Sequence, residues 1–204
     1  MKSAEIIRLF KQNNGYLTST ELVKKKVHTS VIREFVEQGR IERIKRGLYR
    51  LPAEELPQDE NFTHDYFDAA AAVPGGVFCL RTALYYYGLT TSLPSEFEMA
   101  IPPTLRNAKV LQPVIRFHRF KEPFYSSQIE HVDTSLFPIR IYDKERTVCD
   151  NIRLRHIVGE DAAMEGLNSY LKQPKKDINR LLSMAKFCKV RHIVEPSVKA
   201  MSGF

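Results

Sequence analysis

The sequence predicts an α+β protein that begins with a winged helix-turn-helix and continues into a larger mixed α+β domain with a helical C-terminal end. Three patterns indicate this fold class. The first 52 residues hold three short helical patterns followed by a hairpin, short strand patterns occupy the middle of the chain, and helical patterns follow residue 143. The 204 residues are 43% hydrophobic and 27% charged, which is typical of a soluble protein with room for two domains.

The first two helices are predicted from capping residues and apolar spacing. Ser3 is a suitable N-cap, and apolar residues follow it at helical intervals up to the Asn13-Asn14-Gly15 turn. After a short extended connection, Thr18 or Thr20 caps a second helix that ends at Lys26.

A third helix and a hairpin complete the N-terminal pattern. The helix spans Ser30 to Gln38, with Gly39 directly after it. Residues 41–46 then alternate between apolar and charged side chains, and Gly47 allows a tight reversal into a returning strand at 48–51. A three-helix bundle would not end in such a ribbon, so the order favours a winged helix-turn-helix.

An acidic, proline-containing segment separates this pattern from the rest of the chain. We predict the winged helix-turn-helix at 1–52, a linker at 53–63 and the second domain at 64–204. In the second domain we expect helices at 64–73 and 77–88, strands at 97–101, 114–120 and 139–142, a weaker strand at 130–132, and about four helical segments after Asp143, broken near Gly159, Pro174 and Pro196.

The positive charge of the chain is confined to its first quarter. Residues 1–52 contain 12 Lys or Arg and 5 Asp or Glu, a net charge of +7, whereas residues 53–204 contain 19 of each. This asymmetry is typical of a module that meets nucleic-acid phosphates. A membrane surface could also attract a basic segment, but it favours an amphipathic helix over a compact domain.

Binding to double-stranded DNA would use the third helix in the major groove and the hairpin beside it. Arg33 is the best candidate for direct base contact, because a guanidinium can hold a guanine edge with two hydrogen bonds. Thr29 and Ser30 could cap the helix, contact phosphate, or do both. The full set of predicted DNA-binding residues is Lys24, Lys25, Lys26, His28, Thr29, Ser30, Arg33, Arg43, Lys45, Arg46 and Arg50.

Two stretches of this N-terminal segment, residues 14–22 (NGYLTSTEL) and 39–52 (GRIERIKRGLYRLP), resemble the N-terminal domain of AbiEi-type antitoxin regulators. The resemblance continues through shorter, less specific motifs at 77–84 (VFCLRTAL), 87–90 (YGLT) and 145–150 (ERTVCD). It therefore covers most of the chain.

The resemblance implies an antitoxin of a type IV toxin–antitoxin or abortive-infection system. It implies an N-terminal domain that represses its own operon through inverted repeats in the promoter, filled by a homodimer or by two monomers. It also implies a C-terminal domain, residues 64–204 here, that counters a nucleotidyltransferase-like toxin without a stable complex. Two alternatives remain: a regulator whose second domain senses a ligand or dimerises, and a DNA-acting nuclease.

The motifs of several enzyme classes are absent from the sequence. No Asp or Glu is followed two residues later by Lys, as a restriction-type nuclease site would require, and no GxxxxGK[ST], GxGxxG or GxSxG motif occurs. The six histidines and three cysteines lack metal-ligand spacing. We therefore expect a protein that is not an enzyme and that uses no metal or cofactor.

The densest polar cluster, residues 143–150, allows two interpretations. Arg146 and Asp150 stand four residues apart on a predicted helix and would face each other. They could belong to a toxin-countering or active site. We favour a structural role, with Asp143 as the N-cap and Arg146–Asp150 as an ion pair.

The sequence also bears on the location of the protein. No stretch of residues is long and apolar enough to span a membrane, and charges at Glu5 and Arg8 interrupt the region where a signal peptide would be apolar. We therefore expect a cytoplasmic protein without a membrane partner.

Overall fold

A computed structural model describes residues 3–202 and contains two compact units. The N-terminal unit comprises the chain up to Gly75 together with residues 106–115 and 132–139. The C-terminal unit comprises residues 76–105, 116–131 and the chain from Arg140 onward. Residues far beyond the predicted linker therefore belong to the N-terminal unit.

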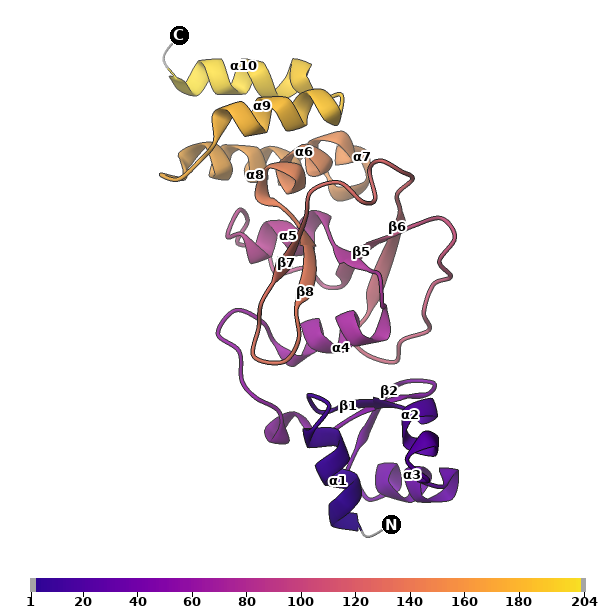
Figure 1. Ribbon diagram of the computed structural model, residues 1–204. Helices are drawn as coiled ribbons and strands as arrows, with labels where there is room; N and C mark the ends of the chain where they lie inside the picture. Colours follow the sequence, from indigo (N-terminus) through magenta and orange to yellow (C-terminus); the bar gives the residue numbers. More distant parts are fainter. Residues whose placement is uncertain (1–2, 203–204) are drawn as a thin grey trace. The chain divides into compact units, whose positions relative to one another are not determined.

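The N-terminal unit has the predicted winged helix-turn-helix order (Figure 1). Phe10, Ile32, Phe35 and Ile41 are buried in its core. The elements are α1 (Ser3–Lys11), β1 (Tyr16–Thr18), α2 (Ser19–Lys24), α3 (Thr29–Glu37), β2 (Glu42–Lys45), β3 (Leu48–Arg50), the 3₁₀ helix η1 (Ala53–Glu55) and α4 (His64–Ala72).

The hairpin β2–β3 is part of a three-stranded sheet of order β1-β3-β2. The predicted extended connection at Tyr16 is the third strand, because β1 pairs with β3 in antiparallel register, Tyr16 opposite Arg50. This strand ties α1 to the hairpin.

The predicted linker is part of the N-terminal unit. Leu56 and Phe62 are buried, and Asp59 accepts a hydrogen bond from the Ser135 backbone at 2.9 Å. The ring of Phe137 packs edge-on against Tyr16, with ring centroids 5.6 Å apart. These contacts explain why residues 132–139 join this unit.

The C-terminal unit is a mixed five-stranded sheet with helices, which confirms the predicted α+β class. The strand order is β6-β5-β4-β8-β7, with β4 antiparallel to β5 and parallel to β8. The strands are β4 (Val77–Phe78), β5 (Phe97–Ile101), β6 (Ile115–Arg119), β7 (Ile129–Val132) and β8 (Ile139–Tyr142), and the helices are α5 (Leu80–Tyr86), α6 (Lys144–Arg153), α7 (Arg155–Val158), α8 (Glu160–Lys172), α9 (Ile178–Phe187) and α10 (Arg191–Ser202).

Helices α8, α9 and α10 lie one above another in Figure 1, and α6 packs against both α8 and α9. The breaks near Gly159 and Pro174 are as predicted. Two expectations were wrong. Val77 and Phe78 form a strand rather than the start of a helix, because they pair with β5. Pro196 lies inside α10, where its ring removes one backbone donor without ending the helix.

Candidate nucleic-acid interface

Helix α2, which precedes the recognition helix, is held at its N-terminus by a capping box. The Thr18 hydroxyl accepts a hydrogen bond from the Glu21 backbone, and the Glu21 carboxylate accepts one from the Thr18 backbone at 2.7 Å. The hydrogen bonds from Thr18 hold the pKa of Glu21 below its usual range. Lys24, Lys25 and Lys26 are exposed at the end of this helix.

The recognition helix α3 begins one residue earlier than predicted and is capped by His28. The His28 ring accepts a hydrogen bond from the Ser30 backbone at 3.4 Å and lies 2.8 Å from the Ser30 hydroxyl. Ile32 and Phe35 face the core, and the Arg40 guanidinium lies 4.4 Å from the centre of the Phe35 ring. His28 therefore caps the recognition helix at its N-terminus.

The outer face of α3 carries the residues that a major groove would meet. Thr29, Ser30 and Arg33 are exposed, as a base- or phosphate-contacting role requires. Beside them, a groove of about 340 Å³ is lined by Val23, Lys26, Val27, His28 and Thr29.

Two acidic residues, Glu34 and Glu37, share this outer face. Arg33 Nε lies 3.3 Å from a Glu37 carboxylate oxygen, and Gln38 donates a hydrogen bond to Glu34 at 2.9 Å. An ion pair this exposed contributes little to folding, but it occupies Nε and leaves both terminal nitrogens of Arg33 for a ligand. No motif in the sequence singles out Glu37.

Glu37→Gln is expected to relax DNA specificity. A carboxylate about 7 Å from a phosphate costs about 0.6 kcal/mol in water, so its loss should tighten binding to unrelated DNA about threefold. Operator binding should gain less, because Arg33 loses the group that orients it. Fluorescence anisotropy on operator and scrambled duplexes measures the ratio, with Glu54→Gln as an exposed control of equal charge change. Equal gains on both duplexes would contradict a role for Glu37 in discrimination.

The wing is the hairpin of β2 and β3, closed at Arg46 and Gly47. Gly47 has a φ of +80°, a left-handed conformation that side chains other than glycine rarely adopt. Arg43 and Arg46 are exposed on this hairpin. In the sequence, Lys24, Lys25 and Lys26 precede α3, and Arg43 and Arg46 follow it, so positive charge flanks this helix on both sides.

Arg50 and Lys45, both predicted to contact DNA, are instead turned into the protein. Arg50 is 9% exposed; it donates a hydrogen bond to Asp68 at 3.1 Å and pairs with Glu42 at 2.9 Å. Lys45 is half-buried, donates to the Ala72 carbonyl at 2.6 Å, and has its pKa lowered by burial. Because these groups are engaged within the N-terminal unit, we remove both residues from the candidate interface.

Asp68 organises the contact between α4 and the winged-helix sheet. Its two carboxylate oxygens accept hydrogen bonds from the Tyr16 hydroxyl at 2.8 Å and from Arg50 Nε at 3.1 Å. Burial raises the pKa of Asp68 and that of Tyr16. The sequence offered one signal for this residue, an acid placed between Phe67 and a run of four alanines.

Asp68→Ala is expected to destabilise the N-terminal unit by about 2–4 kcal/mol, because it leaves a buried hydroxyl and a buried guanidinium short of an acceptor. Urea unfolding followed by circular dichroism measures the loss, and hydrogen exchange of α4 amides locates it. The matched control is Asp65→Ala, an exposed acid on the same helix. If both variants were equally stable, Asp68 would not be the anchor of α4.

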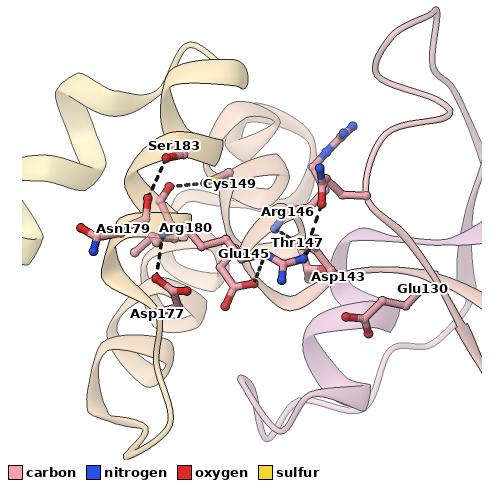
Figure 2. Close-up of polar contacts among 12 residues, drawn as sticks. Glu130, Asp143, Glu145, Arg146, Thr147, Cys149, Asp177, Asn179, Arg180 and Ser183 are labelled. Carbon is pink, nitrogen blue, oxygen red and sulfur yellow. Dashed lines mark hydrogen bonds and ion pairs between the residues drawn. The ribbon is translucent and has the colours of Figure 1, made fainter.

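A second polar cluster lies in the C-terminal unit, around the start of α6 (Figure 2). Asp143 caps α6 by accepting from the Arg146 backbone at 2.7 Å, and Arg146 Nε lies 2.6 Å from Asp150. Arg180 reaches Asp143 at 2.6 Å and Glu145 at 3.3 Å. The predicted N-cap and the predicted ion pair are both confirmed.

Most polar groups of this cluster have partners within the protein, whereas Arg146 Nη1 is buried without a hydrogen bond to the described residues. Glu145 also accepts a hydrogen bond from the Tyr170 hydroxyl at 2.7 Å, and the Arg146 guanidinium lies 4.7 Å from the centre of the Tyr142 ring. Arg146 and Asp150 are almost fully buried. The geometry is that of a structural network that joins α6 to α8 and α9.

Within residues 3–202, which the structure describes, no group of three or more His, Cys, Asp or Glu side chains could hold a metal ion. No helix in the same range is long and apolar enough to cross a membrane.

Residues 4–52 match the model of a family described as "Transcriptional regulator, AbiEi antitoxin". The N-terminal unit therefore carries an AbiEi-type antitoxin and transcriptional-regulator domain, and the resemblance seen in the sequence is confirmed there. The crystal structure of the RV2827C protein from Mycobacterium tuberculosis is similar in fold, with a TM-score of 0.63 and 12% identity over 98% of this chain and 80% of that chain. No curated protein matches the chain.

Proposed function

We propose that this protein is a DNA-binding repressor of its own operon and the antitoxin of a type IV toxin–antitoxin system. The observation that carries the proposal is the exposed set of Lys24, Lys25, Lys26, Arg43 and Arg46 around α3, in a domain that matches the AbiEi regulator family. Phosphate contacts by these cations would position the duplex, and α3 would meet base edges.

We assign DNA binding to residues 1–52 of the N-terminal unit and the antitoxin activity to the C-terminal unit. The DNA partner would be inverted repeats in the promoter, filled by a dimer or two monomers. The functional partner would be a nucleotidyltransferase-like toxin that is countered without a stable complex. Family membership of residues 4–52 supports both partners.

The test separates the two activities in the full chain. The variant Lys24→Gln, Lys25→Gln, Lys26→Gln, Arg43→Gln, Arg46→Gln is compared with the wild type for repression of a promoter reporter and for rescue of cells that express the neighbouring toxin gene. We expect repression to be lost and rescue to persist. Rescue that disappears together with repression, at equal protein level, would contradict the division of activities. Absence of rescue by the wild type would refute the antitoxin assignment.

A further inference from the structure

We propose that residues 106–111, which lie against the edge of the wing, bind DNA phosphate through Lys109. This inference rests on the proposed DNA binding of the N-terminal unit. The segment lies about 60 residues after the wing in sequence and outside residues 4–52, which match the family model.

Backbone contacts attach this segment to the free edge of β2. Val110 forms an antiparallel bridge with Lys45, and the Leu111 backbone donates a hydrogen bond to the Ile44 carbonyl at 2.9 Å. Residues 106–115 accordingly belong to the N-terminal unit. The sheet order β1-β3-β2 is thus extended at β2 by a fourth segment.

The register of the bridge places Lys109 beside the wing turn. Because the bridge is antiparallel, Arg46, which follows Lys45 at the wing turn, and Lys109, which precedes Val110, flank the bridge on the same side. Lys45 and Val110 are both half-buried, whereas Arg46 and Lys109 are both exposed.

Two cations held side by side at the end of a sheet repel each other, which disfavours folding slightly. No acidic residue occurs between Glu98 and Glu122 in the sequence, so the segment itself supplies no compensating carboxylate. An anion shared by Arg46 and Lys109 would remove the repulsion. The phosphate backbone of a duplex held by the wing is the anion that fits this position.

The segment could instead serve only to cover the edge of β2, which a protein must protect from pairing with other strands. In that case its backbone would matter and the charge of Lys109 would not. Charge-removing substitutions in the full-length protein therefore distinguish the two roles.

The experiment measures operator affinity against salt concentration for Lys109→Gln and Lys109→Arg. A lost phosphate contact should reduce the salt slope by about 0.9 and the affinity at 0.1 M salt about eightfold. Lys109→Arg should behave as the wild type. The matched control is Lys172→Gln, an exposed lysine of the C-terminal unit.

A slope for Lys109→Gln equal to that of Lys172→Gln would overturn the inference. The variant Arg46→Gln distinguishes failure of the Lys109 inference from failure of the proposed DNA binding. If Arg46→Gln lowers the slope and Lys109→Gln does not, the wing binds DNA without residues 106–111. If the wild type shows no salt-dependent binding, the proposed function itself is refuted.

Discussion

The variant with glutamine at Lys24, Lys25, Lys26, Arg43 and Arg46 is expected to bind operator DNA about four orders of magnitude more weakly at 0.1 M salt. Each phosphate contact contributes about 0.9 to the slope of log affinity against log salt concentration, so five lost contacts multiply to a large effect. All five side chains are exposed, and the substitutions should leave the fold intact. Fluorescence anisotropy titrations at salt concentrations between about 50 and 200 mM determine both the operator affinity and its salt slope.

The matched control removes five exposed lysines of the C-terminal unit, which are Lys121, Lys172, Lys175, Lys186 and Lys189. It changes the net charge of the chain equally and at a different place. We expect it to retain most of the affinity, since charges beyond about 10 Å from phosphate are screened at 0.1 M salt. If the two variants lost affinity equally, the net charge of the chain would account for binding, and the predicted interface would be wrong.

Asp150→Ala is expected to destabilise the C-terminal unit by about 3–5 kcal/mol, which is a large fraction of the stability of a typical domain. Asp150 is the carboxylate partner of Arg146 at 2.6 Å and of Arg153 at 2.7 Å. Arg146 is fully buried, so removing Asp150 leaves a charge in the core with too few acceptors. Urea unfolding followed by circular dichroism measures the change.

Two controls test the physical reason for this loss. Asp161→Ala removes an exposed acid from α8 and should cost a few tenths of a kcal/mol. The double variant Arg146→Met, Asp150→Leu replaces the whole pair by apolar side chains and should be far closer to the wild type than Asp150→Ala. A double variant as unstable as Asp150→Ala would show that the pair is needed as a pair. If the double variant still rescued cells from the toxin, a chemical role for Arg146 and Asp150 would be excluded.

The sequence determined the N-terminal architecture because the signals for it are local. Capping residues, apolar spacing and the glycine at position 47 act over a few residues, and they predicted three helices and a hairpin close to those observed. The same holds for Asp143 and for the Arg146–Asp150 pair, which lie within two turns of one helix. The location of the positive charge is also a property of the sequence alone.

Tertiary structure decided which basic side chains of the hairpin reach the surface. Residues 43, 45, 46 and 50 are all basic and all belong to the hairpin pattern. The sequence alone therefore does not separate the exposed side chains from the buried ones. Here Asp68 and the Ala72 carbonyl of α4 engage Arg50 and Lys45, so only Arg43 and Arg46 remain exposed.

Long-range pairing also decided the boundaries of the units. Val77 and Phe78 begin an apolar run that predicts a helix. Their pairing with β5, some 20 residues away, makes them a strand. Residues 106–111 carry no strand signal of their own, and they join the wing because β2 offers unpaired backbone groups at its edge. Local sequence specifies the capped helices and the tight turns, whereas short strands and the partners that cover faces and edges depend on distant parts of the chain.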